Sequence, residues 1–448
     1  MVHLVTWRRA CHAILAPLAL VVAAHPLVTG AQQPRVTVFR NVSTVPMDSE
    51  QVLPGQSVVI RGDTIESAGP SGRTQVPAGA LVIDGTGQYL MPGLTDMHVH
   101  LPNPSAPESQ VEAELFLYVA NGVTTARGMA GFDRHLRLRD RVRAGDLIGP
   151  TLFLAGPGLD GQRVKTPEEG EREVRRQRAS GYDLVKVLPG LSLASFDAIV
   201  KTAREVGMPF GGHVPPDVGV RHVLQSGQET IEHLDGYLEL LGGRSPLTSE
   251  AMAPIVSETT AAGVWNVPTM AVMAVNVGEL TNQELTGRSE LEYIGRAYID
   301  EWLALRAKAG IPKPVSDVIQ KNRLHLLKAL NDRGARILLG TDSPQLFNAP
   351  GFSIRREVAM MGEAGLTPYQ ALRAGTQQTG LYFKRNCGTI SPGACADLIL
   401  LGGNPLQDLR NLGRQKGVML RGRWLPQREI EDRLARIRNA PGNYRRHG

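Results

Sequence analysis

The chain has 448 residues, of which 42% are hydrophobic and 21% are charged, and its formal net charge is +6. This composition is typical of a folded globular protein and excludes a disordered or fibrous chain. The positive charge is too small to indicate a nucleic-acid-binding protein.

Residues 1–31 have the organisation of a secretory signal peptide. The pair Arg8 and Arg9 precedes an apolar stretch at 13–24, and small residues lead up to Ala31. The apolar stretch is shorter than the roughly 20 residues of a membrane-spanning helix and contains Pro17, which disfavours a membrane anchor. We therefore expect cleavage after Ala31, by a general or a twin-arginine export route, and a secreted or periplasmic mature protein without a membrane span.

Short alternating apolar runs in residues 32–91 predict β-strands at 36–39, 57–60 and 81–84. A similar pattern returns at 385–428. Two strand-rich segments that bracket a long middle predict one small β-sandwich-like domain built from both termini. Residues 429–448 are expected to form a C-terminal helix and tail. In the returning segment, Cys387 and Cys395 could pair in an oxidising compartment, or stay free.

Residues 92–384 alternate short apolar runs with longer amphipathic stretches, which is typical of repeated βα units. Eight of these runs have the length and character of strands, at 93–98, 122–126, 151–155, 183–188, 209–212, 229–232, 264–268 and 335–340. Eight such units predict an α/β fold with a (β/α)₈ TIM-like barrel.

Potential metal ligands stand at the ends of several predicted strands: His98 and His100 at the first, His213 at the fifth, His233 at the sixth and Asp342 after the eighth. On an extended strand, side chains two residues apart leave the same side, so His98 and His100 can reach one ion. Each residue alone is commonly a packing or turn residue. A barrel, however, collects the carboxyl ends of its strands around one site, and the set therefore predicts a metal centre.

Lys186 lies in the middle of the fourth predicted strand, where burial would remove the hydration of its ammonium group. One explanation is a lysine that pairs with a carboxylate or extends to the strand end. The other is a neutral amine, its pKa lowered by burial, that has added carbon dioxide to become a carbamate. Such a group is a carboxylate that can bridge two cations.

Several motifs occur together in this chain: MPGLTDMHVH at 91–100, Lys186, His213, Glu232 with His233, Gly340 to Asp342, and the run 387–401. The set resembles the amidohydrolase superfamily, and within it the imidazolonepropionase-like group that includes prolidase-like carboxypeptidases. One departure follows the third predicted strand, where related sequences often carry Gly-Gly-His and this chain has GPGLDG at 156–161. That segment also matches a dinucleotide-binding pattern, but no helix opens at the required point.

The resemblance implies a centre of two divalent ions, with zinc as the expected metal. It assigns six side chains to that centre: His98, His100 and Asp342 at one ion, His213 and His233 at the other, and carboxylated Lys186 between them. A water activated by two ions would attack the substrate carbonyl. Asp342 would first accept the proton of that water and then deliver it to the departing nitrogen.

Three further residues have candidate roles. Asp96 could orient a metal-bound histidine or serve a turn at the strand end. Tyr237 resembles a tyrosine that family members place near the substrate, and ordinary packing is the alternative. Arg127 could bind a substrate carboxylate through two hydrogen bonds, or lie on the surface.

The implied reaction is hydrolysis of an amide or peptide bond in a small molecule. The resemblance points to dipeptides or N-acyl amino acids, including aryl amides of amino acids such as mycotoxin conjugates. A cyclic amide or lactone hydrolase is an alternative. A mononuclear deaminase would usually carry Glu three residues after the fifth-strand histidine, where this chain has Pro216. A non-catalytic binding protein would be expected to have lost a ligand position. No nucleic-acid partner is expected, and a homo-oligomer is possible.

Overall fold

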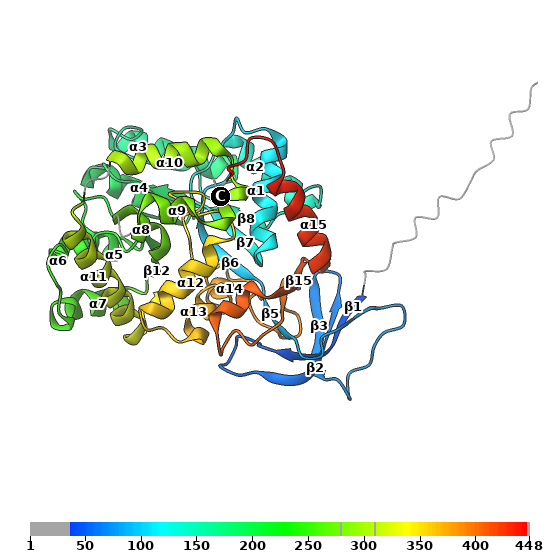
Figure 1. Cartoon of the computed structure of the whole chain (residues 1–448). Coiled ribbons are helices and arrows are strands. Elements are labelled where there is room, and N and C mark those ends of the chain that lie inside the picture. Colours follow the sequence, from blue (N-terminus) through cyan, green and yellow to red (C-terminus); the bar gives the residue numbers. More distant parts are fainter. Residues whose placement is uncertain (1–35, 278–279, 309–310, 446–448) are drawn as a thin grey trace, which may run out of the picture. The chain divides into compact units, whose positions relative to one another are not determined.

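The structure, a computed structural model, describes residues 36–277, 280–308 and 311–445 (Figure 1). The predicted signal peptide, residues 1–31, lies outside the described residues, and its cleavage stays a prediction. Among the described residues, no helix combines the length and the apolar character that crossing a bilayer requires.

Strands from both ends of the described chain form one eight-stranded sheet. Its order is β16-β15-β14-β5-β1-β2-β3, with β4 paired to β1. The bounds are β1 Val36–Thr44, β2 Leu53–Arg61, β3 Thr64–Pro70, β4 Leu81–Asp84, β5 Tyr89–Pro92, β14 Leu398–Leu401, β15 Gln415–Leu420 and β16 Arg423–Pro426. The two ends meet where β5 and β14 run antiparallel, with Leu90 opposite Leu400.

This arrangement corrects the expected sandwich-like pair of sheets, because the described strands of both termini pair edge to edge in a single sheet. Alternating residues of the sheet enclose a common apolar core that includes Phe39, Val58, Ile60, Leu90, Leu398 and Leu400. The predicted domain limits at 91 and 385 stay predictions.

The eight strands predicted between 92 and 384 are all present, as short parallel strands. They are β6 Leu94–Val99, β7 Val123–Gly128, β8 Thr151–Leu154, β9 Val185–Val187, β10 Phe210–Gly212, β11 Thr230–Glu232, β12 Trp265–Val267 and β13 Arg336–Ile337. They form a three-stranded sheet, β6-β7-β8, and a five-stranded sheet, β13-β12-β11-β10-β9. The predicted α/β class is therefore confirmed.

Helices follow these strands along the chain, and Figure 1 shows them outside the strands. Their bounds are α1 Glu108–Ala120, α2 Asp133–Ala144, α3 Pro167–Ser180, α4 Leu193–Glu205, α5 Val220–Ser226, α6 Tyr237–Leu241, α7 Ser249–Ala262, α8 Met270–Val277, α9 Asn282–Thr286, α10 Arg296–Lys308, α11 Lys313–Asp332, α12 Ser353–Glu363, α13 Pro368–Ala374, α14 Gln377–Tyr382 and α15 Gln427–Arg438. Short 3₁₀ helices span Ser289–Tyr293 and Leu409–Gly413.

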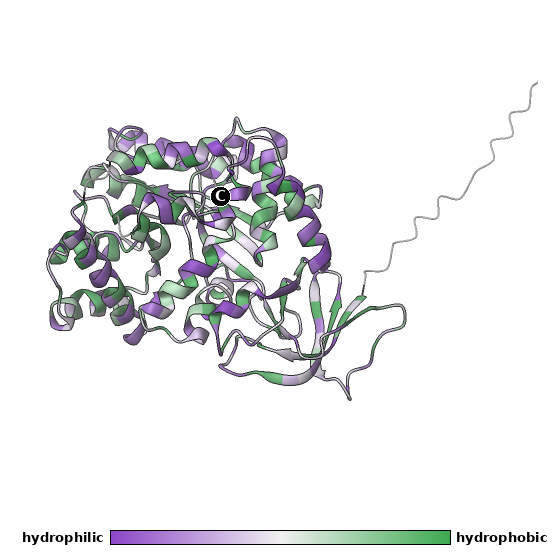
Figure 2. Cartoon of the chain, viewed as in Figure 1, coloured by the Kyte–Doolittle hydropathy of each residue, from purple (hydrophilic) through white to green (hydrophobic). Residues whose placement is uncertain are grey.

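The local sequence explains where these elements begin and end, and which of their faces are buried. Helix α3 begins with a capping box, in which Thr166 and Glu169 satisfy each other's backbone amides, and it ends at Gly181 in the left-handed conformation. The parallel strands are buried on both faces, as all six residues of β6 show. Figure 2 shows outer helices such as α15 as mostly hydrophilic.

Cys387 and Cys395 are joined by a disulfide. They bracket part of the connection from α14 to β14, so this bond secures the point at which the chain returns to the sheet.

Candidate metal centre

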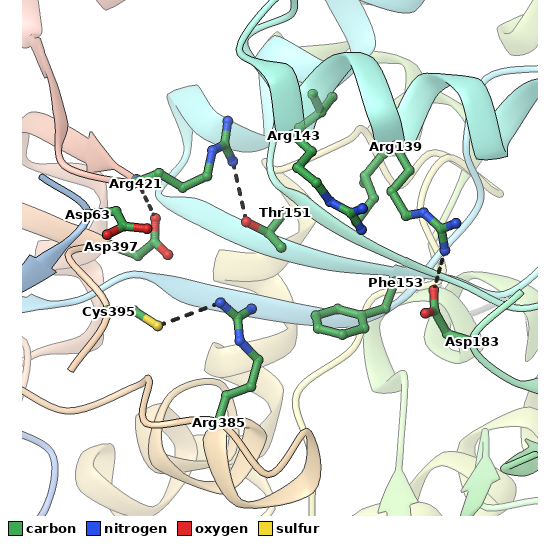
Figure 3. A pocket seen from close by; sticks show the side chains of 12 residues that line it. Asp63, Arg139, Arg143, Thr151, Phe153, Asp183, Arg385, Cys395, Asp397 and Arg421 are labelled. Atoms are coloured by element: carbon green, nitrogen blue, oxygen red, sulfur yellow. Dashed lines mark hydrogen bonds and ion pairs between the residues drawn. The ribbon is translucent and has the colours of Figure 1, made fainter. Parts of the chain in front are cut away.

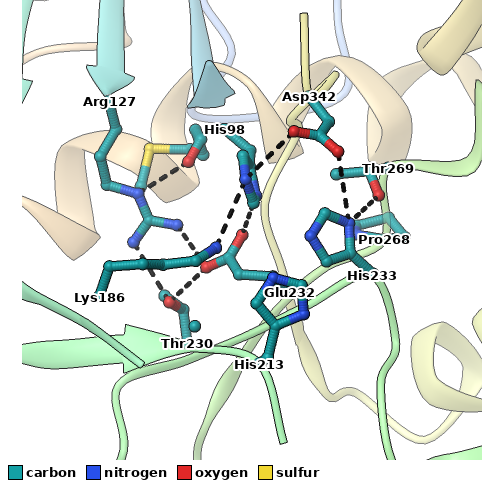
Figure 4. A network of polar contacts seen from close by, with 12 residues as sticks. His98, Arg127, Lys186, His213, Thr230, Glu232, His233, Pro268, Thr269 and Asp342 are labelled. Atoms are coloured by element: carbon teal, nitrogen blue, oxygen red, sulfur yellow. Dashed lines mark hydrogen bonds and ion pairs between the residues drawn. The ribbon is translucent and has the colours of Figure 1, made fainter. Parts of the chain in front are cut away.

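Three of the predicted ligands form a tight buried cluster. His98 lies on β6, His233 directly follows β11, and Asp342 lies in the loop after β13 (Figure 4). His98 Nε2 lies 3.4 Å from Asp342 Oδ1, and His233 Nδ1 lies 4.0 Å from Asp342 Oδ2. One ligand atom from each residue falls within 4.8 Å of the other two, so the cluster can hold a metal ion.

His100 and His213 extend this cluster on its two sides. His100 Nε2 lies 2.8 Å from Asp342 Oδ1. The ring centroid of His213 lies 4.7 Å from that of His233. Both rings are partly open to solvent, with 28% and 22% of their side-chain surface exposed, whereas His98 is buried. The structure thus brings the four predicted histidines and Asp342 together.

Lys186 reaches the same cluster from the middle of β9. Its side chain is buried, and its Nζ lies 3.5 Å from His98 Nε2. Burial lowers the pKa of this amine, and the nearby carboxylates of Glu232 and Asp342 offset only part of that effect. Among the described residues, no carboxylate lies within ion-pair distance of Nζ, so the pairing that would explain a buried lysine is not formed there.

The backbone at two ligands adopts a conformation that is rare without glycine. His233 and Asp342 have φ values of 59° and 61°, in the left-handed region. Backbone hydrogen bonds hold both residues, from His233 to Val267 and from Asp342 to His98. Such strain persists only where surrounding structure enforces it, and it is common at functional sites.

Gly340 makes the close approach of β6 and the Asp342 loop feasible. A Cβ atom at this position would lie 2.5 Å from Val267 Cγ1 and 3.0 Å from the backbone nitrogen of His98. Only glycine fits there, and its place in the motif has a steric cause.

Each of three histidines has a polar partner for its Nδ1 atom that the sequence did not assign. His98 Nδ1 lies 2.8 Å from Glu232 Oε2, His213 Nδ1 lies 2.5 Å from Asp235 Oδ2, and His233 Nδ1 lies 2.7 Å from Thr269 Oγ1. Partners of this kind fix the orientation of a metal-binding ring. Their signal in the sequence was a polar residue within or just after a predicted strand.

The predicted role of Arg127 in binding a substrate carboxylate is wrong. Its side chain is fully buried, and its Nη2 donates to Glu232 Oε1 at 2.7 Å. Its Nε donates to the carbonyl oxygen of Met97 at 2.7 Å, and Nη1 donates to the hydroxyl of Tyr382 at 3.1 Å. The guanidinium group is committed to internal contacts, and it acts on the cluster through Glu232, the partner of His98.

The predicted substrate role of Tyr237 is also wrong. Its side chain is fully buried, and its hydroxyl donates to Asn266 Oδ1 at 2.9 Å and accepts from Thr259 Oγ1 at 3.2 Å. These contacts hold the hydroxyl group between a residue of β12 and a residue of α7. Burial raises the pKa of the phenol, which therefore stays protonated.

Asp96 supports the metal cluster through hydrogen bonds to the two segments that carry His98 and Asp342. Its carboxylate accepts from the backbone nitrogen of His98 at 3.2 Å, from the backbone nitrogen of Thr341 at 3.0 Å and from Thr341 Oγ1 at 2.6 Å. It contacts no imidazole ring in these hydrogen bonds. Asp96 therefore ties β6 to the segment that carries Asp342.

The electrostatics of the cluster favour an ionised aspartate. Burial by itself raises the pKa of Asp342, but the neighbouring His98, His100 and Lys186 lower it by more, so the pKa of this carboxyl lies below its ordinary value. Burial lowers the pKa of His98 and His233 well below the usual range, which keeps their rings neutral and able to bind a cation.

Curated proteins with similar sequences are deaminases. An adenine deaminase from Rubrobacter xylanophilus is 27% identical over 203 residues, which cover 41% of this chain and 33% of that protein. A 5-methylthioadenosine/S-adenosylhomocysteine deaminase from Caldanaerobacter subterraneus subsp. tengcongensis is 22% identical over 410 residues, which cover 81% of this chain and 84% of that protein. The chain thus matches about a third of the length of the adenine deaminase.

Solved structures with a similar fold include bottromycin amidohydrolase, at a TM-score of 0.72 and 23% identity, with 91% of this chain and 92% of that chain covered. A Xaa-Pro dipeptidase with bound methionine has a TM-score of 0.67 and 21% identity, with 87% and 100% covered. At these identities the likeness concerns the fold.

The model of the amidohydrolase family matches residues 89–425, which include every residue of the candidate centre and confirm the resemblance seen in the motifs. The chain therefore belongs to the amidohydrolase family, whose members are hydrolases that act on carbon–nitrogen bonds.

Proposed function

We propose that this protein hydrolyses an amide or peptide bond with two divalent ions, zinc being the expected metal, and with Lys186 carboxylated between them. The position of Lys186 carries the proposal. A buried amine with a lowered pKa, next to His98 and without an ion pair among the described residues, fits a carbamate better than an ammonium group.

The donor set of the cluster fits such a centre. His98, His100 and Asp342 would hold one ion, and His213 and His233 the other. Divalent ions bound there would activate a water molecule and polarise the scissile carbonyl. Asp342 keeps an ionised carboxylate in reach of both groups of histidines, so it can accept a proton from the attacking water and pass it to the departing nitrogen.

The eight parallel strands would form one closed (β/α)₈ barrel. Isolated bridges between Ala155 and Leu184 and between Leu159 and Val187 connect the β8 side to β9. A further bridge between Val99 and Ser343 connects β6 to the segment after β13. These contacts support closure at both gaps between the two sheets, and closure would direct all six ligands to one end.

For the substrate we propose a dipeptide or an N-acyl amino acid. This choice is supported by fold likeness to a dipeptidase and an amidohydrolase. Since the side chains of Arg127 and Tyr237 are buried and bonded to other parts of the protein, residues that bind a substrate carboxylate would come from elsewhere in the site.

A deaminase is the second candidate, because the curated relatives are deaminases. His213 is followed by Val214, Pro215 and Pro216, which leaves no carboxylate where a deaminase of this superfamily usually has its glutamate. The amidase proposal therefore fits the described site better.

Purified zinc- or manganese-loaded protein would be assayed with dipeptides, N-acyl amino acids, lactams, lactones and adenine. We expect release of free amino acids from the first two classes, and loss of that activity after chelation. Turnover of lactones alone would contradict the proposal, and release of ammonia from adenine without amide cleavage would establish the deaminase.

We also propose export to an oxidising compartment, which the Cys387–Cys395 disulfide supports. N-terminal sequencing of the protein from its native compartment should find Gln32 first. A mature protein that begins at Met1 would contradict export by cleavage.

A further inference from the structure

A cavity of about 360 Å³ lies away from the metal cluster, near the amino ends of the parallel strands (Figure 3). Thr151 is the first residue of β8 and lines it, whereas the candidate metal ligands lie within their strands or beyond the other ends. Asp183, just before β9, lines it as well. The cavity is therefore distinct from the centre described above.

Four arginines line this cavity: Arg139 and Arg143 from α2, Arg385 after α14, and Arg421 between β15 and β16. Two of them are fixed by the protein. Arg139 Nη1 donates to Asp183 Oδ2 at 3.0 Å, and its buried Nε has no hydrogen-bond partner. Arg421 Nη1 donates to the carbonyl oxygen of Gly149 at 3.2 Å.

The other two guanidinium groups have no carboxylate partner within the described residues. Arg143 is exposed, and its side chain makes no hydrogen bond with a described residue. Arg385 Nη2 makes a 3.7 Å contact with Cys395 Sγ, a weak acceptor, and its guanidinium lies 5.9 Å from the centre of the Phe153 ring. In Figure 3 the two side chains extend toward the same space, one from α2 and the other from the opposite side.

Among the described residues, the acidic side chains of the cavity form no ion pair with these two arginines, and three aspartates face four arginines. Asp183 accepts from Arg139 and from the backbone nitrogen of Leu154 at 2.7 Å. Asp397 accepts from the backbone nitrogen of Arg421 at 2.8 Å. Burial raises the pKa of Asp397, and the nearby charges of Arg421 and Arg385 offset only part of that effect. Asp63 is exposed and accepts from its neighbour Thr64. The space between Arg143 and Arg385 therefore carries excess positive charge.

We propose that this cavity binds a small organic anion, whose carboxylate or phosphate group is held by Arg143 and Arg385. Guanidinium groups present paired donors that match either anion. Val142, Leu152 and Phe153 supply apolar walls for the rest of the ligand. The proposal is independent of the reaction at the metal cluster.

The test is calorimetric titration of the full, metal-loaded protein with inorganic phosphate and, separately, with benzoate. We expect binding of one or both anions, and a loss of affinity of tenfold or more in the double variant Arg143→Gln with Arg385→Gln. Arg137→Gln is the matched control, since Arg137 is exposed on the same helix and does not line the cavity. Circular dichroism and Tm would show that the variants fold.

Binding of phosphate alone or of benzoate alone supports the proposal and assigns the anionic group. If the double variant does not fold, the exposed Arg143→Gln variant alone should weaken binding. No binding of either anion to the wild type would overturn the proposal. Undiminished binding to the variants would also overturn it, because the anion would then occupy another place, such as the metal centre.

Discussion

Replacing Glu232 by glutamine separates two functions of one buried carboxylate. Glu232 Oε1 accepts from Arg127 Nη2 at 2.7 Å and from Thr230 Oγ1 at 2.6 Å, while Oε2 faces His98 Nδ1 at 2.8 Å. In Glu232→Gln, the amide oxygen should face the two donors, so the amide nitrogen faces His98. His98 Nδ1 must then accept, and the ring proton moves to Nε2, the atom that faces the cluster.

Both consequences can be given a magnitude. Side chains of Arg127 and Glu232 are 0% exposed, so removal of one charge leaves the other buried, at a cost of about 3 kcal/mol in the free energy of unfolding. A protonated Nε2 cannot bind a cation, and loss of such a partner lowers metal affinity by roughly 10- to 100-fold. Urea unfolding measures the first effect, and zinc competition with a chromophoric chelator measures the second.

A second variant tells the two effects apart. Adding Arg127→Met to Glu232→Gln removes the unpaired charge, so part of the lost stability should return while zinc affinity stays low. Wild-type zinc affinity in a folded Glu232→Gln protein would refute the reasoning about the ring proton. Unchanged stability in the single variant would refute the reasoning about the ion pair.

Three further predictions follow from named side chains. Lys186→Ala should lose one of the two metal ions per chain and most of the activity, as measured by elemental analysis and turnover. The exposed control Lys201→Ala should match the wild type. Two bound ions and a near-normal rate in Lys186→Ala would rule out the carbamate. Asp342→Asn should slow turnover by roughly 10²- to 10⁴-fold, since it removes the proton acceptor, and an unchanged rate would exclude that role. Burial raises the pKa of Glu114 to about 7 from 4.5. The folded state therefore binds this proton more tightly than the unfolded state does. As the pH rises from 4.5 to 7, the free energy of unfolding should fall by about 3 kcal/mol. In Glu114→Gln this loss should vanish in urea unfolding at a series of pH values; a pH profile parallel to that of the wild type would contradict it.

Much of the fold and centre could be predicted because the relevant signals are local. Each parallel strand is a short apolar run, and each ligand stands within or just after one. His98 and Asp342 are 3.4 Å apart although far apart in sequence, because parallel strands deliver their carboxyl ends to one place.

The errors concern contacts that depend on distant parts of the chain. Arg127 stands near the end of β7, where a charged residue suggests exposure, but its partner Glu232 lies on another strand. Tyr237 follows Gly236, whose φ of 79° turns the chain so that the tyrosine packs toward Thr259. Nothing in the neighbouring residues indicates either partner.

The order of the strands in the sheet also depends on distant parts of the chain. Alternating apolar residues identify individual strands but carry no information on which strand lies beside which. The single sheet therefore became visible only in the three-dimensional arrangement, where β5 meets β14.

That junction has a consequence for how the polypeptide is made. Until β14 leaves the ribosome, one side of β5 has no neighbour, and roughly 300 residues must be translated in between, which takes about 15 to 60 s at typical elongation rates. An unpaired strand edge attracts other chains during this interval. The eight-stranded sheet is thus completed only after the C-terminal part of the chain has been synthesised. A chain truncated before Leu398 would keep an unpaired edge at β5 that can bind other chains.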